Sequence, residues 1–170
     1  AVVQWLRDQL GIIKSAPEIE ALAKTVENNG GVTFIPALAG LGAPYWDPHA
    51  TGSIMGITRG TQKGHIARAS LEAIAMRTRE IVIEMQKDAN TTFKILKVDG
   101  GGSTNDLLMQ IQSDLLQVEV IRPKTTETTA LGVAFFVGLA SGYWPSIESL
   151  SSIWEIDKKT DNGNSTHGDV

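Results

Sequence analysis

The sequence predicts an α/β fold with a mixed sheet flanked by helices. In its second half, strand-type stretches at 94–98 and 118–121 alternate with helix-type stretches at 105–116 and 128–141. This order is typical of helices layered on a sheet. A turn of three successive glycines, Gly100 to Gly102, joins the first of these strands to its helix. The length of 170 residues is sufficient for one domain with a hydrophobic core.

The first half begins with two predicted helices. Apolar residues recur at helical spacing over 2–13 and predict an amphipathic helix there. Ser15 and Glu18 have the spacing of a capping box, in which the serine accepts a backbone hydrogen bond, and they predict a second helix over 17–27. Two short strands and one long helix complete this half, over 32–35, 52–58 and 65–86.

A single predicted helix joins the two strands of the second half. Such a helix is compatible with a right-handed crossover between parallel strands, but the connection is short. An antiparallel arrangement of the two strands therefore stays open.

The two ends of the chain differ in character. From Ala1 onwards the sequence is helix-like without an initiator Met, which indicates either a trimmed protein or part of a longer chain; we favour the second. After Trp154 the composition becomes polar, and 157–169 contain no apolar residue. We therefore expect one domain over 1–155, followed by a disordered tail over 156–170.

The composition argues against several functional classes. Hydrophobic residues make up 42% of the chain and charged residues 20%, ordinary values for a soluble globular protein. The net charge of −4 gives no support to a nucleic-acid partner, which would need a basic surface. Cysteine is absent, which excludes disulfides and thiolate metal sites, and the three histidines lack ligand spacing. No stretch has the length of a membrane span and the start is not a signal peptide, so we expect no membrane partner and a cytoplasmic location.

The glycine turn at 98–105 is the strongest candidate for a binding site. Glycines let a backbone approach a ligand closely, and the helix that follows offers unpaired N–H groups at its start. The phosphate or ribose of a nucleotide would suit this arrangement. A tight strand-to-helix turn capped by Ser103 is the alternative. The turn matches neither the dinucleotide fingerprint nor the P-loop.

The loop from Gly40 to Pro48 combines glycines, prolines and aromatic residues, so its backbone is expected to be shaped rather than flexible. Asp47 is a candidate catalytic carboxylate in this loop. The alternative is an Asp-Pro turn with Tyr45 and Trp46 packed beneath it, and we prefer that interpretation.

Three segments resemble the glycerol kinases of the FGGY carbohydrate kinase family. The loop from Gly40 to Pro48 closely resembles one of their segments. Residues 52–57, followed after seven residues by 65–72, fit the second FGGY signature at every defined position. Residues 4–8 resemble a helix-starting run, although the glycine that opens this run in the family is missing here. The resemblance covers nearly the whole chain up to about Trp154.

The glycine turn is similar to the adenosine-contacting turn of these kinases, whose nucleotide-binding lobe has the actin/hexokinase-like (ribonuclease H-like) ATPase fold. The resemblance implies that the backbone at Gly100 and Gly101 lies against the nucleotide and that Asn105 lies near the base. It also implies that Gln4 touches ATP. His65 and Glu72, within the signature, are expected to bond across the packed strand and helix in an architectural role.

The resemblance implies that the chain is the C-terminal nucleotide-binding lobe of a kinase that transfers the γ-phosphoryl group of ATP to glycerol, giving sn-glycerol 3-phosphate. Such a transfer uses Mg²⁺ to neutralise phosphate charge and a carboxylate near the attacking hydroxyl. In the family, the glycerol contacts and the catalytic carboxylate lie in a segment that is not present here. We therefore expect no catalytic or metal-binding residue in this chain and no activity from the chain alone. The full-length enzyme is expected to be a homo-oligomer.

Two other interpretations stay open. The first is another FGGY kinase, acting on a pentulose or a sugar acid. The second is a non-catalytic module that keeps the fold, although the retained glycines at 100–102 and Asn105 argue against a decayed site. Nucleotide binding would discriminate between a working site and a decayed one.

Overall fold

The computed structural model describes residues 1–151, 153 and 155–163. These residues form two compact units, which divide the chain between Thr92 and Phe93. The domain predicted over 1–155 includes this boundary.

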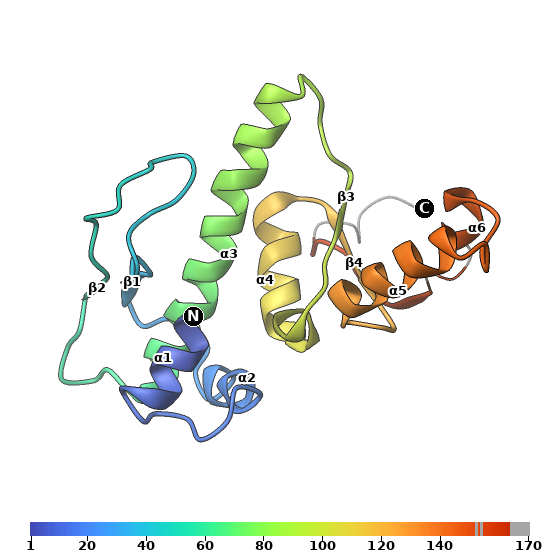
Figure 1. Ribbon diagram of the computed structural model, residues 1–170. Helices are drawn as coiled ribbons and strands as arrows, with labels where there is room; N and C mark the ends of the chain where they lie inside the picture. Colours follow the sequence, from blue (N-terminus) through green and yellow to red (C-terminus); the bar gives the residue numbers. More distant parts are fainter. Residues whose placement is uncertain (152, 154, 164–170) are drawn as a thin grey trace, which may run out of the picture. The chain divides into compact units, whose positions relative to one another are not determined.

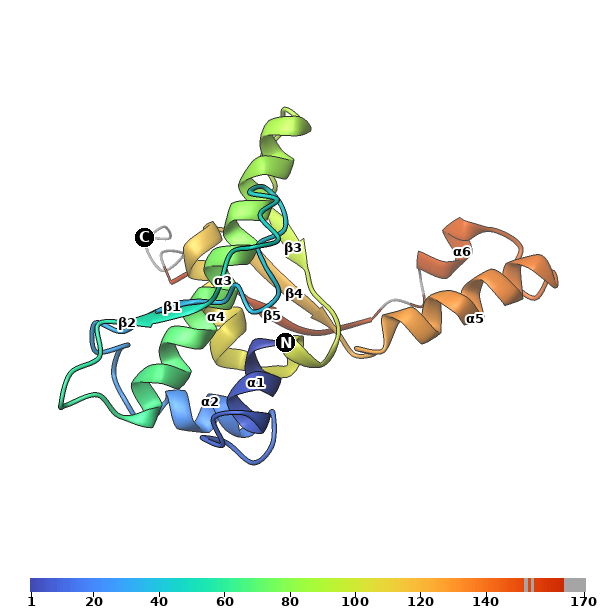
Figure 2. The ribbon, with the colours of Figure 1, turned by 60° about the vertical axis from the view of Figure 1, so that its left-hand side comes forward.

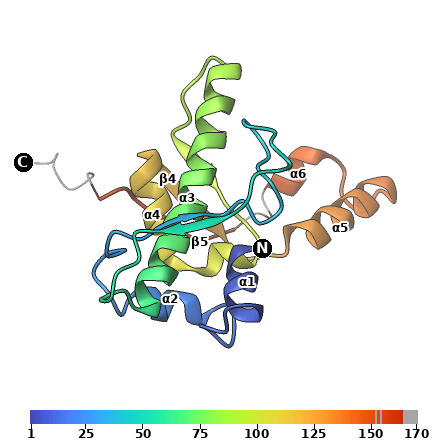
Figure 3. The same ribbon diagram turned by 90° about the vertical axis from the view of Figure 1, so that its left-hand side faces the viewer.

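The first unit is built around one long helix. Helix α3 (Lys63–Asp88) packs against the short helices α1 (Val2–Asp8) and α2 (Glu18–Ala23). The strands β1 (Thr33–Ile35) and β2 (Ser53–Met55) form an antiparallel pair, and β1 lies against α3 (Figures 1 and 3).

The core of the first unit lies where β1 meets α3. Phe34 of β1 is buried with Ala69 and Ala73 of α3, and Trp5 of α1 packs against this cluster. The rings of Trp5 and Phe34 are 6.1 Å apart between centroids. The two alanines lie one helical turn apart on α3, so their small side chains leave room for the strand to approach the helix.

The side chains that begin the helices of this unit differ from the predictions. Ser15 does not cap a backbone N–H as expected; its hydroxyl donates to Glu18 at 2.9 Å, and helix α2 begins only at Glu18. Of the two residues expected to bond across the packed strand and helix, Glu72 does so, because it accepts from Asn29 Nδ2, in the segment before β1, at 2.7 Å; it also accepts from Arg68 Nε at 2.9 Å. His65 instead caps α3, because its Nδ1 accepts from the backbone N–H of Gln62 at 3.0 Å.

The second unit contains a three-stranded mixed sheet in the order β3-β4-β5. Strand β3 (Ile95–Lys97) is parallel to β4 (Glu119–Pro123), and β4 is antiparallel to β5 (Ile156–Thr160). Helix α4 (Asp106–Leu116) connects β3 to β4 and buries one apolar face. The arrangement left open by the sequence is therefore parallel, and the predicted mixed sheet is confirmed. A 3₁₀ turn at Gly101–Thr104 and the helices α5 (Thr128–Ala140) and α6 (Ile147–Ser151) complete the unit (Figures 1 and 2).

The predicted disordered tail over 156–170 is wrong over 156–160, where the chain forms strand β5. Its side chains are mostly exposed, so the segment carries no apolar pattern, yet its backbone pairs with β4. Ion pairs with residues of α4 and β4 balance its charges: Lys158 lies 2.8 Å from Asp106 and Lys159 lies 3.0 Å from Glu119. An edge strand of this kind is held by backbone bonds and charge rather than by burial. The remainder of the predicted tail, 164–170, lies outside the described residues.

Candidate functional site

The glycine turn connects β3 to α4, and three of its residues have defined structural roles. Gly100 has φ of 73°, a conformation that favours glycine. Asn105 is the residue that caps α4, because its Oδ1 accepts from the N–H of Leu108 at 2.8 Å. Ser103, the cap in the alternative interpretation, instead donates its hydroxyl to the carbonyl of Gly100 at 2.7 Å. The cap named in that alternative was wrong, although the turn leads into the helix as predicted.

Gly101 and Gly102 are explained neither by backbone conformation nor by packing. Neither has a positive φ, and a Cβ added at either position would meet no atom within 4 Å. A larger side chain is therefore compatible with the turn itself. Asn105, the N-cap of α4, follows four residues after Gly101, and a helix N-terminus favours negative charge and hydrogen-bond acceptors.

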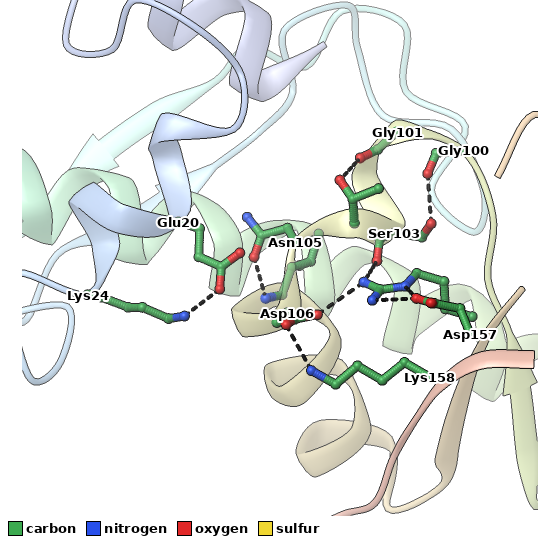
Figure 4. A network of polar contacts seen from close by, with 12 residues as sticks. Glu20, Lys24, Gly100, Gly101, Ser103, Asn105, Asp106, Asp157 and Lys158 are labelled. Carbon is green, nitrogen blue, oxygen red and sulfur yellow. Dashed lines mark hydrogen bonds and ion pairs between the residues drawn. The ribbon is translucent and has the colours of Figure 1, made fainter. Parts of the chain in front are cut away.

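Arg122 of β4 holds the turn from one side. Its Nη1 donates to the carbonyl of Ser103 at 2.9 Å and to Asp106 Oδ1 at 3.0 Å. Its Nε donates to Asp157 of β5 at 2.8 Å. Figure 4 shows this network, with Lys158 bonded to the same Asp106 carboxylate. The hydrogen bond from Lys158, reinforced by the one from Arg122, keeps the pKa of Asp106 below its ordinary value.

The segment between β4 and α5 holds the turn from the other side. The N–H of Gly100 donates to the carbonyl of Thr126 at 3.0 Å. The hydroxyl of Thr128, the first residue of α5, donates to the carboxylate of Asp99. Arg122 and Thr128 lie far from the turn in sequence, which is why sequence reasoning did not find them.

Asn105 has unused hydrogen-bonding capacity. Its Oδ1 is engaged in the cap, but within the described part of the chain its Nδ2 has no protein partner. The residue is half-buried at the start of α4. Its amide N–H groups can therefore donate to a ligand while the cap remains formed.

The structure groups three of the four predicted binding residues. Gly100, Gly101 and Asn105 lie within one turn of the second unit. Gln4 belongs to α1 of the first unit, where its side chain is exposed while its neighbour Leu6 is buried in the core.

The comparisons with known proteins identify the family. The family model for the C-terminal domain of the FGGY family of carbohydrate kinases matches residues 1–141. The chain belongs to this family. The FGGY match includes both units and ends just after α5.

Curated FGGY relatives at high identity are glycerol kinases. The one from Deinococcus radiodurans is 60% identical over 159 residues, which cover 94% of this chain and 32% of the relative. The one from Oleidesulfovibrio alaskensis is 57% identical with the same coverage. The chain thus spans about a third of the length of the curated relatives that it matches.

Solved FGGY structures share the fold. The crystal structure of Plasmodium falciparum glycerol kinase with ADP has a TM-score of 0.82 and 35% identity, over 95% of this chain and 32% of that one. Gluconate kinase from Lactobacillus acidophilus has a TM-score of 0.79 and 25% identity, over 96% and 34% of the two chains. The predicted actin/hexokinase-like ATPase fold is therefore confirmed.

The FGGY loop at Gly40–Pro48 is shaped as predicted, but its aromatic residues are not covered. Asp47 Oδ1 accepts from the N–H of His49 at 2.9 Å and of Ala50 at 3.2 Å, which makes it a turn-forming residue. Tyr45 and Trp46 were expected to pack beneath the turn. Instead they are 56% and 76% exposed. The Tyr45 hydroxyl donates to Glu80 at 3.2 Å, and the Arg77 guanidinium lies over the Tyr45 ring, 5.2 Å from its centroid.

Several other features of this FGGY chain bear on function. Two cavities of about 420 and 450 Å³ lie beside β1 in the first unit, and neither is lined by the glycine turn. Within the described ranges, no three His, Asp or Glu side chains come close enough together to hold a metal ion. Over the same ranges, every helix is too short or too polar to cross a membrane.

Proposed function

We propose that this chain is the ATP-binding C-terminal part of a glycerol kinase, which transfers the γ-phosphoryl group of ATP to glycerol and releases sn-glycerol 3-phosphate. The observation that carries the proposal is the open face of Gly101 beside the unused amide of Asn105. The curated relatives, at 56% to 60% identity, support glycerol as the acceptor.

Each site residue has a proposed role that follows from its geometry. The backbone at Gly100 and Gly101 lies against the adenosine part of ATP, where a side chain would occupy the space of the ligand. Asn105 donates from Nδ2 to the base while its Oδ1 maintains the helix cap. Gln4, exposed on α1 of the first unit, keeps the ATP contact that the family resemblance implies for it. The P. falciparum relative, solved with ADP, supports a nucleotide as the ligand.

The remaining parts of the reaction are proposed to lie outside this chain. Mg²⁺ commonly binds through substrate phosphates and few carboxylates, so we assign it to the phosphates of ATP rather than to a protein site here. It would neutralise the charge on the transferred phosphoryl group. The glycerol contacts and the catalytic carboxylate belong to the other two thirds of the enzyme. The chain alone is thus inactive, and the full-length enzyme is a cytoplasmic homo-oligomer.

Another FGGY acceptor is the weaker proposal. Identity falls from 35% for the glycerol kinase structure to 25% for gluconate kinase and 24% for xylulose kinase from L. acidophilus. All three kinases share the fold, so sequence identity, and not architecture, separates the glycerol kinase from the other two.

Calorimetric titration of the 170-residue chain with Mg-ATP tests the nucleotide site. We expect saturable binding that weakens by about 3- to 10-fold in Asn105→Ala, the value of one or more lost hydrogen bonds. Asn105→Asp is the matched variant, because aspartate still caps a helix but has no Nδ2 donor. It should keep the thermal stability of the parent and lose binding like the alanine variant.

Two results would overturn the proposal. Unchanged ATP affinity in Asn105→Asp would remove Asn105 from the site, and a folded parent chain that binds no nucleotide would favour a non-catalytic module. A separate assay tests whether the acceptor site lies outside this chain. Glycerol-dependent ATP hydrolysis or glycerol phosphorylation by the chain alone would contradict the assignment of the acceptor site to the rest of the enzyme.

A further inference from the structure

Helix α5 is apolar on all sides and yet exposed. No residue between Thr128 and Ala140 carries a charge. Val133, Phe136 and Val137 are 60%, 75% and 62% exposed. A helix that is hydrophobic all round is normally buried in the core of a large protein. Figure 2 shows α5 and α6 extending away from the sheet of their own unit.

One side of α5 is already covered. The ring of Trp144 lies 5.3 Å from that of Phe135, between centroids, and a Cβ on the buried Gly138 would collide with the same indole. The opposite side carries Val133, Phe136 and Val137, which share a face because they are three and four residues apart. We call these three residues the α5 patch.

The family match indicates what covers this patch. The FGGY model extends to residue 141, so α5 belongs to the family fold rather than to an addition beyond it. The chain supplies 32% of the length of its curated relatives. We propose that the α5 patch packs against the polypeptide that forms the other two thirds of an FGGY kinase. This inference rests on family membership and is independent of the proposed reaction.

The composition of α5 favours a protein core over a lipid surface. A helix that lies on a membrane has a basic polar face, and α5 has no charged residue. Its 13 residues are fewer than the roughly 20 that a membrane-spanning helix needs. Exposed apolar patches on a folded domain usually mark a protein contact.

A covered α5 also has a direct connection to the glycine turn. The helix begins at Thr128, whose hydroxyl bonds to Asp99, and Thr126 accepts from the N–H of Gly100. Packing on α5 therefore fixes the segment that holds one side of the turn.

Cysteine labelling tests the patch, because the chain has no cysteine of its own. Val137→Cys places one thiol in the patch, and Met85→Cys places one at a site on α3 that is 52% exposed. Each variant is labelled in two forms: the 170-residue chain alone, and a chimera in which this chain replaces the aligned third of D. radiodurans glycerol kinase with its own cysteines changed to serine.

We expect Val137→Cys to react at least about 30-fold more slowly in the chimera than in the chain alone, while Met85→Cys changes by less than about threefold. Equal labelling of Val137→Cys in both forms would overturn the inference. Protection that rises with the concentration of the chain alone would also overturn it, because a second copy would then cover the patch.

Co-expression provides the second measurement if the chimera does not fold. The tagged chain is expressed with the remaining two thirds of the D. radiodurans enzyme, and co-purification is scored. The parent chain should retain its partner, whereas Phe136→Glu should lose at least about nine tenths of it, as expected for a charge buried in an interface. Absence of a partner on the parent chain, or full retention by Phe136→Glu, would contradict the proposal.

Discussion

The loop at Gly40–Pro48 and the turn at Asp99–Asn105 both depend on glycine, but for opposite reasons. At Gly40, φ is 77° and an added Cβ would lie 2.8 Å from the carbonyl oxygen of Asp47, so the fold itself requires glycine. At Gly101, φ is not positive and an added Cβ would meet nothing within 4 Å. The fold requires glycine at position 40, whereas neither backbone conformation nor packing requires it at position 101.

The two segments also differ in how they are held. The loop closes on itself, through the bond from the N–H of Leu41 to the carbonyl of Asp47 at 2.7 Å, and α3 supports it through the bond from Arg77 to the carbonyl of Ala43 at 2.9 Å. The turn is held by charged side chains from two strands, chiefly Arg122. A substitution at the loop glycine Gly40 should therefore reduce stability, whereas one at the turn glycine Gly101 should reduce nucleotide binding.

The largest expected effect is on stability, from Gly40→Ala. The substitution places a Cβ against the backbone of Asp47 in a left-handed conformation, which costs about 1–3 kcal/mol. Chemical denaturation of the 170-residue chain measures the loss. The Mg-ATP affinity of the folded protein should stay at the parent value. A stable Gly40→Ala protein would show that the loop relaxes around the new methyl group, and the contrast with Gly101 would then be lost.

Gly101→Leu should have the reverse pattern. The side chain enters space that the turn leaves open, so the free energy of unfolding should change by no more than about 0.5 kcal/mol. Mg-ATP affinity should fall at least about tenfold, equivalent to about 1.4 kcal/mol, because the leucine occupies the position proposed for adenosine. Calorimetry and denaturation on the same sample separate the two quantities. Normal ATP affinity in Gly101→Leu would remove this glycine from the site.

Sequence reasoning succeeded where the signal is local. The glycine turn between a strand and a helix was predicted from consecutive residues. The parallel pairing of β3 with β4 was left open by the sequence, and the cap at Asn105 was not predicted. Sequence reasoning did not find Arg122, because the partners of this side chain are 16 to 35 residues away and no pattern links them. Strand β5 was not predicted, because it is held by backbone pairing with β4 and by ion pairs. Neither kind of contact produces a periodic pattern of apolar residues in the sequence.

Arg122→Met tests whether the turn is positioned by side-chain contacts. The variant loses the bond to Ser103 and leaves Asp106 and Asp157 with fewer partners, so stability should fall by about 1–2 kcal/mol and ATP affinity by about threefold. Asp157→Asn is the matched control, because it weakens the outer ion pair of Arg122 but keeps the bond to Ser103. If the control weakens ATP binding as much as Arg122→Met, the contact with Ser103 is not what positions the turn.

The smallest expected effect is on how steeply the unfolding temperature falls below about pH 4. The hydrogen bonds from Lys158 and Arg122 lower the pKa of Asp106 in the folded protein. A carboxyl with a depressed folded pKa stabilises the protein above its unfolded pKa, and this contribution is lost as the pH falls below about 4 towards the folded value. Asp106→Asn removes the titrating group, so the fall in unfolding temperature between about pH 4 and pH 2.5 should be shallower than in the parent. An unchanged slope would mean that Asp106 exchanges its partners for water without cost, and that the charged network around the glycine turn contributes geometry rather than stability.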